Sequence, residues 1–151
     1  MNKIALLIED DLNGLDRAIN AAKAQGFIET LNCYLDKSID VRWVKSYDEF
    51  IKYIKQNGIP DMLWFDHDLG GNSYSLYRKH QGYKGSNINY DEYDEKTGYH
   101  CAKWLVDYCL DNNLTFKAEV HAHSMNEVGR KNILSILDNF KKFQLNNPII
   151  K

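Results

Sequence analysis

The chain has 151 residues, of which 44% are hydrophobic and 26% are charged, and its formal net charge is −2 at pH 7. This length suits about one domain with a single apolar core, which excludes an intrinsically disordered chain. No block of Lys and Arg is present, so the composition excludes a duplex nucleic acid as a partner.

The sequence also bears on where the protein resides. No secretion signal, no apolar run of membrane-spanning length and no CxxC spacing among the three cysteines can be found. We therefore expect a reduced, cytoplasmic protein with no membrane partner, organised as a single domain over residues 1–151.

The first strand is predicted at residues 4–8, a short apolar run typical of parallel strands that are covered by helices on both faces. Apolar residues at helical spacing predict a helix over residues 15–22, with a stop at Gly26. Residues 27–35 fit both a helix and a strand, and we favour the helix.

The second strand is predicted at residues 41–44. Ser46 and Glu49 then have the spacing of a capping box at the start of a helix, which Gly58 ends before a third strand at residues 61–65. A long insertion follows at about residues 70–96, rich in Gly, Asn, Ser and Tyr and without a sustained period. Connections of this length are normally functional or disordered, and we expect a flap or hairpin whose tyrosines stack a base or ribose.

A third amphipathic helix is predicted to open at Thr97-Gly98 and to end near residues 112–113. The fourth strand is expected at residues 116–120, running into residues 121–124, before a last helix. This order predicts an α/β fold, a three-layer sandwich with a mainly parallel sheet of four to five strands in the order 2-1-3-4.

Carboxylates follow two of these strands, at the sheet edge where open α/β folds bind their ligands. Asp10 and Asp11 come after the first strand, and Asp66 and Asp68 come after the third. Grouped carboxylates repel one another, and a divalent cation relieves that repulsion, so these four residues predict a site for Mg²⁺ or Mn²⁺. Asp10 or Asp11 alone would equally serve as a helix N-cap.

Histidines supply the candidate proton-transfer groups. His121 and His123 flank one alanine and share a side of an extended segment, which suits proton transfer or metal ligation, or packing as neutral imidazoles. His67 lies between Asp66 and Asp68 and points the other way in a strand, so a structural role stands beside a catalytic one. The candidate catalytic residues are Asp66, His67 and His123.

The start of the last helix offers groups for binding phosphate. Ser124 and Asn126 are short hydrogen-bonding residues just before the helix N-terminus, and Arg130 lies within its first turns. Together with His121, these three residues form the predicted phosphate- and substrate-binding set.

Four motifs in this chain resemble those of the cyclic-phosphate-processing receiver domains. They are the acidic pair Asp10-Asp11, D-H-D-L at 66–69, T-G-Y at 97–99 and H-S-x-N-x-x-G-R-x-N at 123–132. The resemblance covers nearly the whole chain and implies a receiver-like, flavodoxin-like fold. It also implies an acidic pocket of Asp10, Asp11 and Asp66 that holds Mg²⁺ beside a phosphate.

The favoured function is a metal-dependent phosphoesterase that processes a cyclic or terminal phosphate on a small nucleotide derivative. The surplus of carboxylates and histidines over what phosphate binding needs favours chemistry over binding. The alternative is a non-catalytic binder or sponge of a nucleotide signal. The third hypothesis is a degenerate response-regulator receiver phosphorylated on Asp66, which the lack of a clear final strand with its lysine disfavours.

Overall fold

The computed structural model describes residues 2–10 and 38–149. Within them, four strands form one parallel sheet in the order β2-β1-β3-β4. The strands are β1 (Lys3–Ile8), β2 (Ile39–Val44), β3 (Met62–Asp66) and β4 (Glu119–His123). The predicted α/β class and strand order are therefore confirmed. The predictions for residues 15–22 and 27–35 lie outside the described residues.

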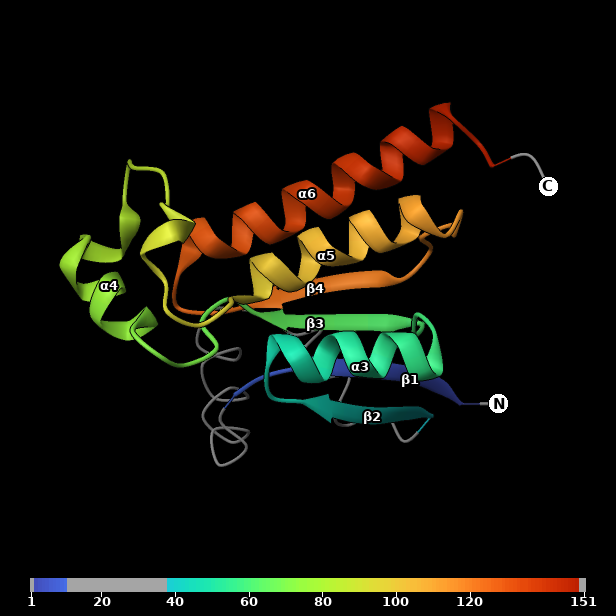
Figure 1. Cartoon of the computed structure of the whole chain (residues 1–151), viewed down its shortest axis with the longest axis horizontal. Helices are drawn as coiled ribbons and strands as arrows, with labels where there is room; N and C mark the ends of the chain where they lie inside the picture. Colours follow the sequence, from blue (N-terminus) through green and yellow to red (C-terminus); the bar gives the residue numbers. More distant parts are fainter. Residues whose placement is uncertain (1, 11–37, 150–151) are drawn as a thin grey trace.

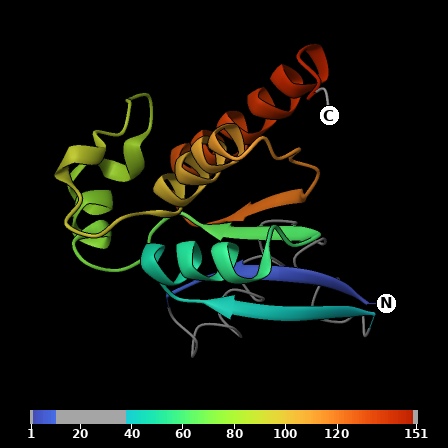
Figure 2. The same cartoon turned by 45° about the vertical axis from the view of Figure 1, so that its right-hand side comes forward.

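Three long helices cover one face of this sheet (Figures 1 and 2). They are α3 (Tyr47–Asn57), α5 (Gly98–Asp111) and α6 (Glu127–Asn146). A shorter helix, α4 (Ser73–Lys79), lies beyond the end of the sheet at which the strands terminate (Figure 1). No helix within the described residues is both long enough and apolar enough to cross a membrane.

The two central strands are buried on both faces, as their continuous apolar sequences predict. Leu6 and Phe65 belong to a core shared with the three long helices, whereas Leu7 and Trp64 belong to a second apolar cluster. Because side chains alternate along a strand, these two clusters occupy opposite faces of the sheet. The sheet therefore has a fixed register, and its ends place polar residues at defined positions.

The helix-capping residues predicted from the sequence largely match those in the structure. Ser46 Oγ accepts a hydrogen bond from the Glu49 N–H at 3.2 Å, as predicted. The Glu49 carboxylate instead reaches back one residue further, to the Lys45 N–H at 2.9 Å. Gly58 ends α3 with φ +80°, a left-handed conformation that glycine adopts without strain.

The predicted start of the fourth strand was wrong. β4 begins at Glu119 rather than Phe116, because its first partner in β3 is Met62. Phe116 is buried by packing against Phe140 of α6, with ring centroids 6.2 Å apart, and its N–H donates to the Gln144 side chain. The apolar pattern therefore reports burial by a helix, not pairing in the sheet.

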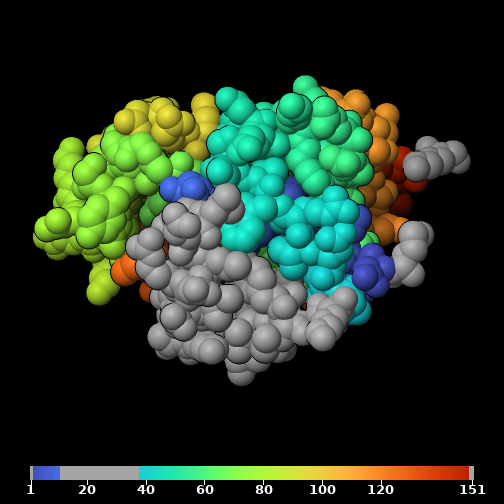
Figure 3. Space-filling view, turned by 90° about the horizontal axis from the view of Figure 1, so that it is seen from below, coloured from blue at the N-terminus to red at the C-terminus, as the bar shows by residue number. Residues whose placement is uncertain are grey.

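The insertion is not a hairpin. Within residues 70–96 it contains α4 and two short 3₁₀ turns, η2 (Gln81–Tyr83) and η3 (Tyr90–Glu92). Figure 3 shows its green part as a lobe at one end of the molecule. The sequence concealed α4 because only Ser73 and Leu76 of its seven residues are buried, which leaves no apolar stripe.

Candidate functional site

The register of the sheet brings three titratable residues into one row. Ile8 pairs with Phe65, so the next residue, Glu9, lies beside Asp66, and Asp66 pairs with His123. Paired positions on parallel neighbours project from the same face. Glu9, Asp66 and His123 therefore lie side by side at the carboxyl ends of β1, β3 and β4, the edge at which open α/β sheets bind ligands.

These three side chains converge as well as align. One ligand atom from each lies within 4.8 Å of the other two, and His123 Nε2 lies 2.9 Å from Glu9 Oε2. All three residues are buried, with exposed fractions of 8 to 9%. We call this set the acidic row.

Burial and mutual repulsion act on the carboxyl groups of the acidic row. Burial and then the neighbouring Glu9 carboxylate, with smaller effects from Asp68 and Asp10, raise the pKa of Asp66 well above its usual value. Burial also acts to raise the pKa of Glu9, but the hydrogen bond and charge of His123 outweigh it, so that this pKa is lowered. Burial and the Glu9 carboxylate thus disfavour ionisation of Asp66, whereas His123 favours ionisation of Glu9.

The residues of the acidic row fit a divalent cation. Two carboxylates and an imidazole in mutual reach are usual ligands, and a cation offsets the repulsion that holds the pKa of Asp66 high. A buried polar atom also points to a ligand here: across residues 2–10 and 38–149, His123 Nδ1 finds no hydrogen-bond partner. The carboxylate oxygens suit Mg²⁺ or Mn²⁺.

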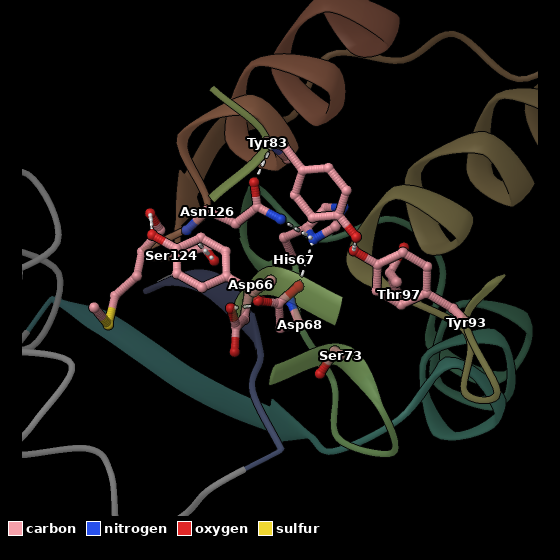
Figure 4. A network of polar contacts seen from close by, with 12 residues as sticks. Asp66, His67, Asp68, Ser73, Tyr83, Tyr93, Thr97, Ser124 and Asn126 are labelled. Carbon is pink, nitrogen blue, oxygen red and sulfur yellow. Dashed lines mark hydrogen bonds and ion pairs between the residues drawn. The ribbon is translucent and has the colours of Figure 1, made fainter. Parts of the chain in front are cut away.

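His67 lies on the opposite side of the chain from Asp66. It is completely buried, and its Nδ1 lies 2.7 Å from Asp68 Oδ1. A carboxylate only accepts hydrogen bonds, so Nδ1–H donates to Asp68. Figure 4 shows the imidazole between Asp68 and Asn126, whose Nδ2 lies 3.5 Å from the same nitrogen.

The other nitrogen of His67 connects to the insertion. Its Nε2 lies 3.0 Å from the Tyr90 hydroxyl, which accepts a hydrogen bond from Asn132 Nδ2 at 3.0 Å. With Nδ1 protonated, Nε2 accepts from the Tyr90 O–H. Asn132, Tyr90, His67 and Asp68 thus form a continuous chain of hydrogen bonds, here called the His67 chain.

Two glycines of the sequence motifs allow this arrangement by their lack of a side chain. A Cβ on Gly129 would lie 2.4 Å from the ring of His67. A Cβ on Gly98 would lie 1.9 Å from the Asp66 carbonyl oxygen, and the Gly98 N–H donates to the His67 carbonyl at 2.8 Å. The starts of α5 and α6 therefore press directly on the 66–68 segment.

The predicted metal ligands are distributed around the acidic row. Asp66 is at its centre, whereas Asp68 is turned toward His67 and its N–H donates to Asp66 Oδ1 at 3.3 Å. Asp10 is exposed and close enough to contribute to the raised pKa of Asp66. Asp11 lies outside the described residues.

The predicted phosphate-binding residues are mostly engaged in local structure. Asn126 is completely buried, and its Oδ1 caps α6 by accepting from the Gly129 N–H at 2.9 Å. Ser124 Oγ accepts from the Asn126 N–H, and an Arg130 guanidinium N–H donates to the Ser124 carbonyl. Phosphate contacts by these residues stay a prediction.

His121 is separated from the strand ends. It lies one alternation earlier on β4 than His123 and stacks on Trp64, with ring centroids 4.1 Å apart. Its Nε2 is 3.5 Å from a Glu119 carboxylate oxygen. This position matches the packing alternative for an imidazole beside a strand neighbour, and a substrate contact by His121 stays a prediction.

Sequence reasoning assigned no role to Glu9 and did not predict the contact of Tyr90 with His67. Glu9 could have been found from the register, since it follows β1 as Asp66 ends β3 and therefore shares a row with it. Tyr90 carried no comparable signal, because its contact with His67 depends on the path of the insertion.

A comparison with known protein families covers all parts of this site. The family model described as cyclic-phosphate processing receiver domain matches residues 5–139. That span includes the acidic row, the His67 chain and the insertion. No curated protein matches the chain.

Proposed function

The chain belongs to the cyclic-phosphate processing receiver domains, and from this premise we propose that it is a metal-dependent phosphoesterase. Its substrate is a cyclic or terminal phosphate on a small nucleotide derivative. The observation that carries the proposal is the acidic row, in which Glu9, Asp66 and His123 meet at the ligand-binding edge of the sheet.

The acidic row has the wrong charge to bind a phosphate by itself. Carboxylates repel an anion, so a phosphate approaches this edge only when a cation stands between them. We infer that Glu9 and Asp66 hold a divalent cation, with Asp10 beside them, and that Mn²⁺ or Mg²⁺ fills this role. When bound, such a cation neutralises charge on the phosphate and lowers the pKa of a coordinated water.

His123 is positioned for proton transfer. Glu9 engages its Nε2 at 2.9 Å and so fixes the orientation of the ring, while the buried Nδ1 is the nitrogen left to exchange a proton. In hydrolysis of a cyclic phosphate, the water oxygen bonds to phosphorus and one ester P–O bond breaks. His123 takes a proton from the water and then gives it to the leaving ribose oxygen, which yields a phosphomonoester.

The test is product analysis by chromatography. The protein is incubated with Mn²⁺ or Mg²⁺ and a panel of cyclic nucleotides, nucleotide 2′,3′-cyclic phosphates and ADP-ribose cyclic phosphate. The Asp66→Asn variant is compared with Asp138→Asn, a matched change at an exposed position on α6. Cation-dependent turnover that only Asp66→Asn loses supports the proposal.

Two other results would replace this function. Tight retention of one unchanged nucleotide would identify a binder or sponge. Stable phosphorylation of Asp66 by a phosphodonor, without turnover of the panel, would identify a degenerate response regulator.

A further inference from the structure

A second binding region lies away from the acidic row, between the insertion and helices α5 and α6. It is a groove of about 500 Å³. Its polar wall is formed by Asn87, Tyr90, Tyr99, Asn132, Ser135 and Asn139. We call it the asparagine groove, and we propose that it binds a neutral nucleobase. This inference goes beyond the proposed function, because it concerns a separate site.

The charge of the asparagine groove sets the class of ligand. No residue that lines it is charged, and two isoleucines, Ile88 and Ile136, supply apolar surface. A phosphate would find no cation in this lining, whereas an uncharged ring loses little by leaving water. The occupant is therefore a neutral group with apolar faces.

An aromatic stack supplies a platform for a planar ligand. Tyr93 stacks on Tyr90 with ring centroids 5.7 Å apart, and Tyr90 stacks on Tyr99 at 4.4 Å with an interplanar angle of 18°. Tyr90 is thus stacked against two other tyrosines of the protein. Tyr99 is partly exposed and lines the groove, so a base that stacks on its ring would extend the stack by one ring.

The amide side chains match the edges of a base. Asn132, Ser135 and Asn139 are spaced three and four residues apart on α6 and so form one stripe along the helix. Each asparagine amide offers an acceptor and two donors, which is the pattern that pairs with the edge of a nucleobase. Asn132 uses one donor on Tyr90 and keeps its carbonyl oxygen for a ligand.

The groove is linked to the acidic row through shared residues. Tyr90 and Asn132 belong both to the groove lining and to the His67 chain, which ends at Asp68 beside Asp66. A base that orders Tyr90 and Asn132 therefore also orders the segment that carries Asp66. By thermodynamic reciprocity, a ligand at the acidic row strengthens binding in the groove.

The experiment uses nucleosides, which carry a base but no phosphate. The ¹⁵N-labelled protein is titrated with adenosine and cytidine, and separately with ribose 5-phosphate, which carries a phosphate but no base. The side-chain amide signals of Asn87, Asn132 and Asn139 report on the groove, and the backbone signals of Glu9 and Asp66 report on the acidic row. We expect nucleosides to shift the groove signals and ribose 5-phosphate to leave them unchanged.

Two variants test the assignment to the groove. Tyr99→Leu removes the platform, and Asn139→Ala removes one exposed amide without touching the core. We expect Tyr99→Leu to weaken nucleoside binding by about tenfold, as measured for stacking on aromatic side chains. Asn139→Ala should weaken it less. Tyr74→Leu, a matched change at an exposed tyrosine of α4, should leave binding unchanged.

Three results would overturn the proposal. They are an absence of groove shifts with both nucleosides, shifts confined to Glu9 and Asp66, and binding that survives both Tyr99→Leu and Asn139→Ala. These measurements involve no phosphate hydrolysis. A failure of nucleoside binding would therefore be distinguishable from a failure of phosphoesterase turnover.

Discussion

Asp66 and His67 are neighbours in the chain, but their side chains have opposite environments. Asp66 joins two other titratable groups, and burial with the nearby Glu9 charge raises its pKa. Both ring nitrogens of His67 have hydrogen-bond partners, and glycine makes room for its ring. From the repulsion on one side and the satisfied bonds on the other, we propose that the Asp66 side acts on ligands while the His67 side holds it in place.

The largest expected effect comes from removing the charge of Asp66. Asp66→Asn should reduce cation-dependent turnover by about 10²- to 10³-fold, the scale of losing one electrostatic contact to a transition state. The same change removes a buried repulsion, so the variant should gain about 0.5–2 kcal/mol of unfolding free energy. Parallel assays of turnover and urea unfolding check both effects. A variant that loses activity and stability together would contradict a strained acidic row.

The second prediction concerns the His67 side of the 66–68 segment, which Gly129 contacts. In a helix, Gly→Ala alone is stabilising by about 1 kcal/mol, but a Cβ here would lie 2.4 Å from the His67 ring. We expect the steric overlap to outweigh the gain in helix propensity, so that Gly129→Ala destabilises the protein by about 1–3 kcal/mol.

Urea unfolding measures the change in unfolding free energy, and the sign of that change decides this prediction. Ser135→Ala, an exposed position on the same helix, serves as the control and should change the unfolding free energy little. A Gly129→Ala protein more stable than the wild type would show that α6 does not press on His67.

A smaller effect is expected from breaking the His67 chain at Tyr90. Tyr90→Phe leaves the buried Nε2 of His67 and the Asn132 amide without their shared partner, at a cost of about 1–2 kcal/mol. Tyr74→Phe at an exposed site is the matched control. A double-mutant cycle with Asn132→Ala isolates the coupling, and additive single effects would disprove a continuous chain.

The fold was largely predictable from local patterns, but the acidic row was only half predictable. Apolar runs and caps predict the order 2-1-3-4, since each reflects short-range burial or hydrogen bonding. The role of Glu9 follows only when strand pairing is known, because Asp10 and Asp11 match the family motif equally well. Tyr90 and α4 were beyond reach, since the insertion packs through isolated residues rather than a periodic face.

The smallest predicted effect concerns pH and the start of α5. Burial, followed by the charge of Lys96, lowers the pKa of His100 from 6.5 to about 4. The unfolded chain therefore binds more protons in this window, and stability falls as the pH drops from 6.5 toward 4. His100 Nδ1 accepts from the Thr97 N–H, a role that glutamine at the same capping position can keep.

His100→Gln should therefore flatten this part of the pH dependence. The change is expected to be under about 1 kcal/mol, because His100 is partly exposed and solvent screens its charge. Urea midpoints compared at about pH 7 and about pH 5 provide the measurement. An unaltered slope in the variant would assign the acid sensitivity to other groups.

The central claim is that Glu9 and Asp66 hold one cation beside His123, and Glu9 tests it most directly because only the strand register places it in the acidic row. Electron paramagnetic resonance measures Mn²⁺ binding to the wild type, Glu9→Gln and the control Asp138→Asn. We expect one Mn²⁺ site in the wild type and the control, and binding weakened by about 10- to 100-fold in Glu9→Gln. Unchanged Mn²⁺ affinity in Glu9→Gln, or no Mn²⁺ binding in the wild type, would contradict the account.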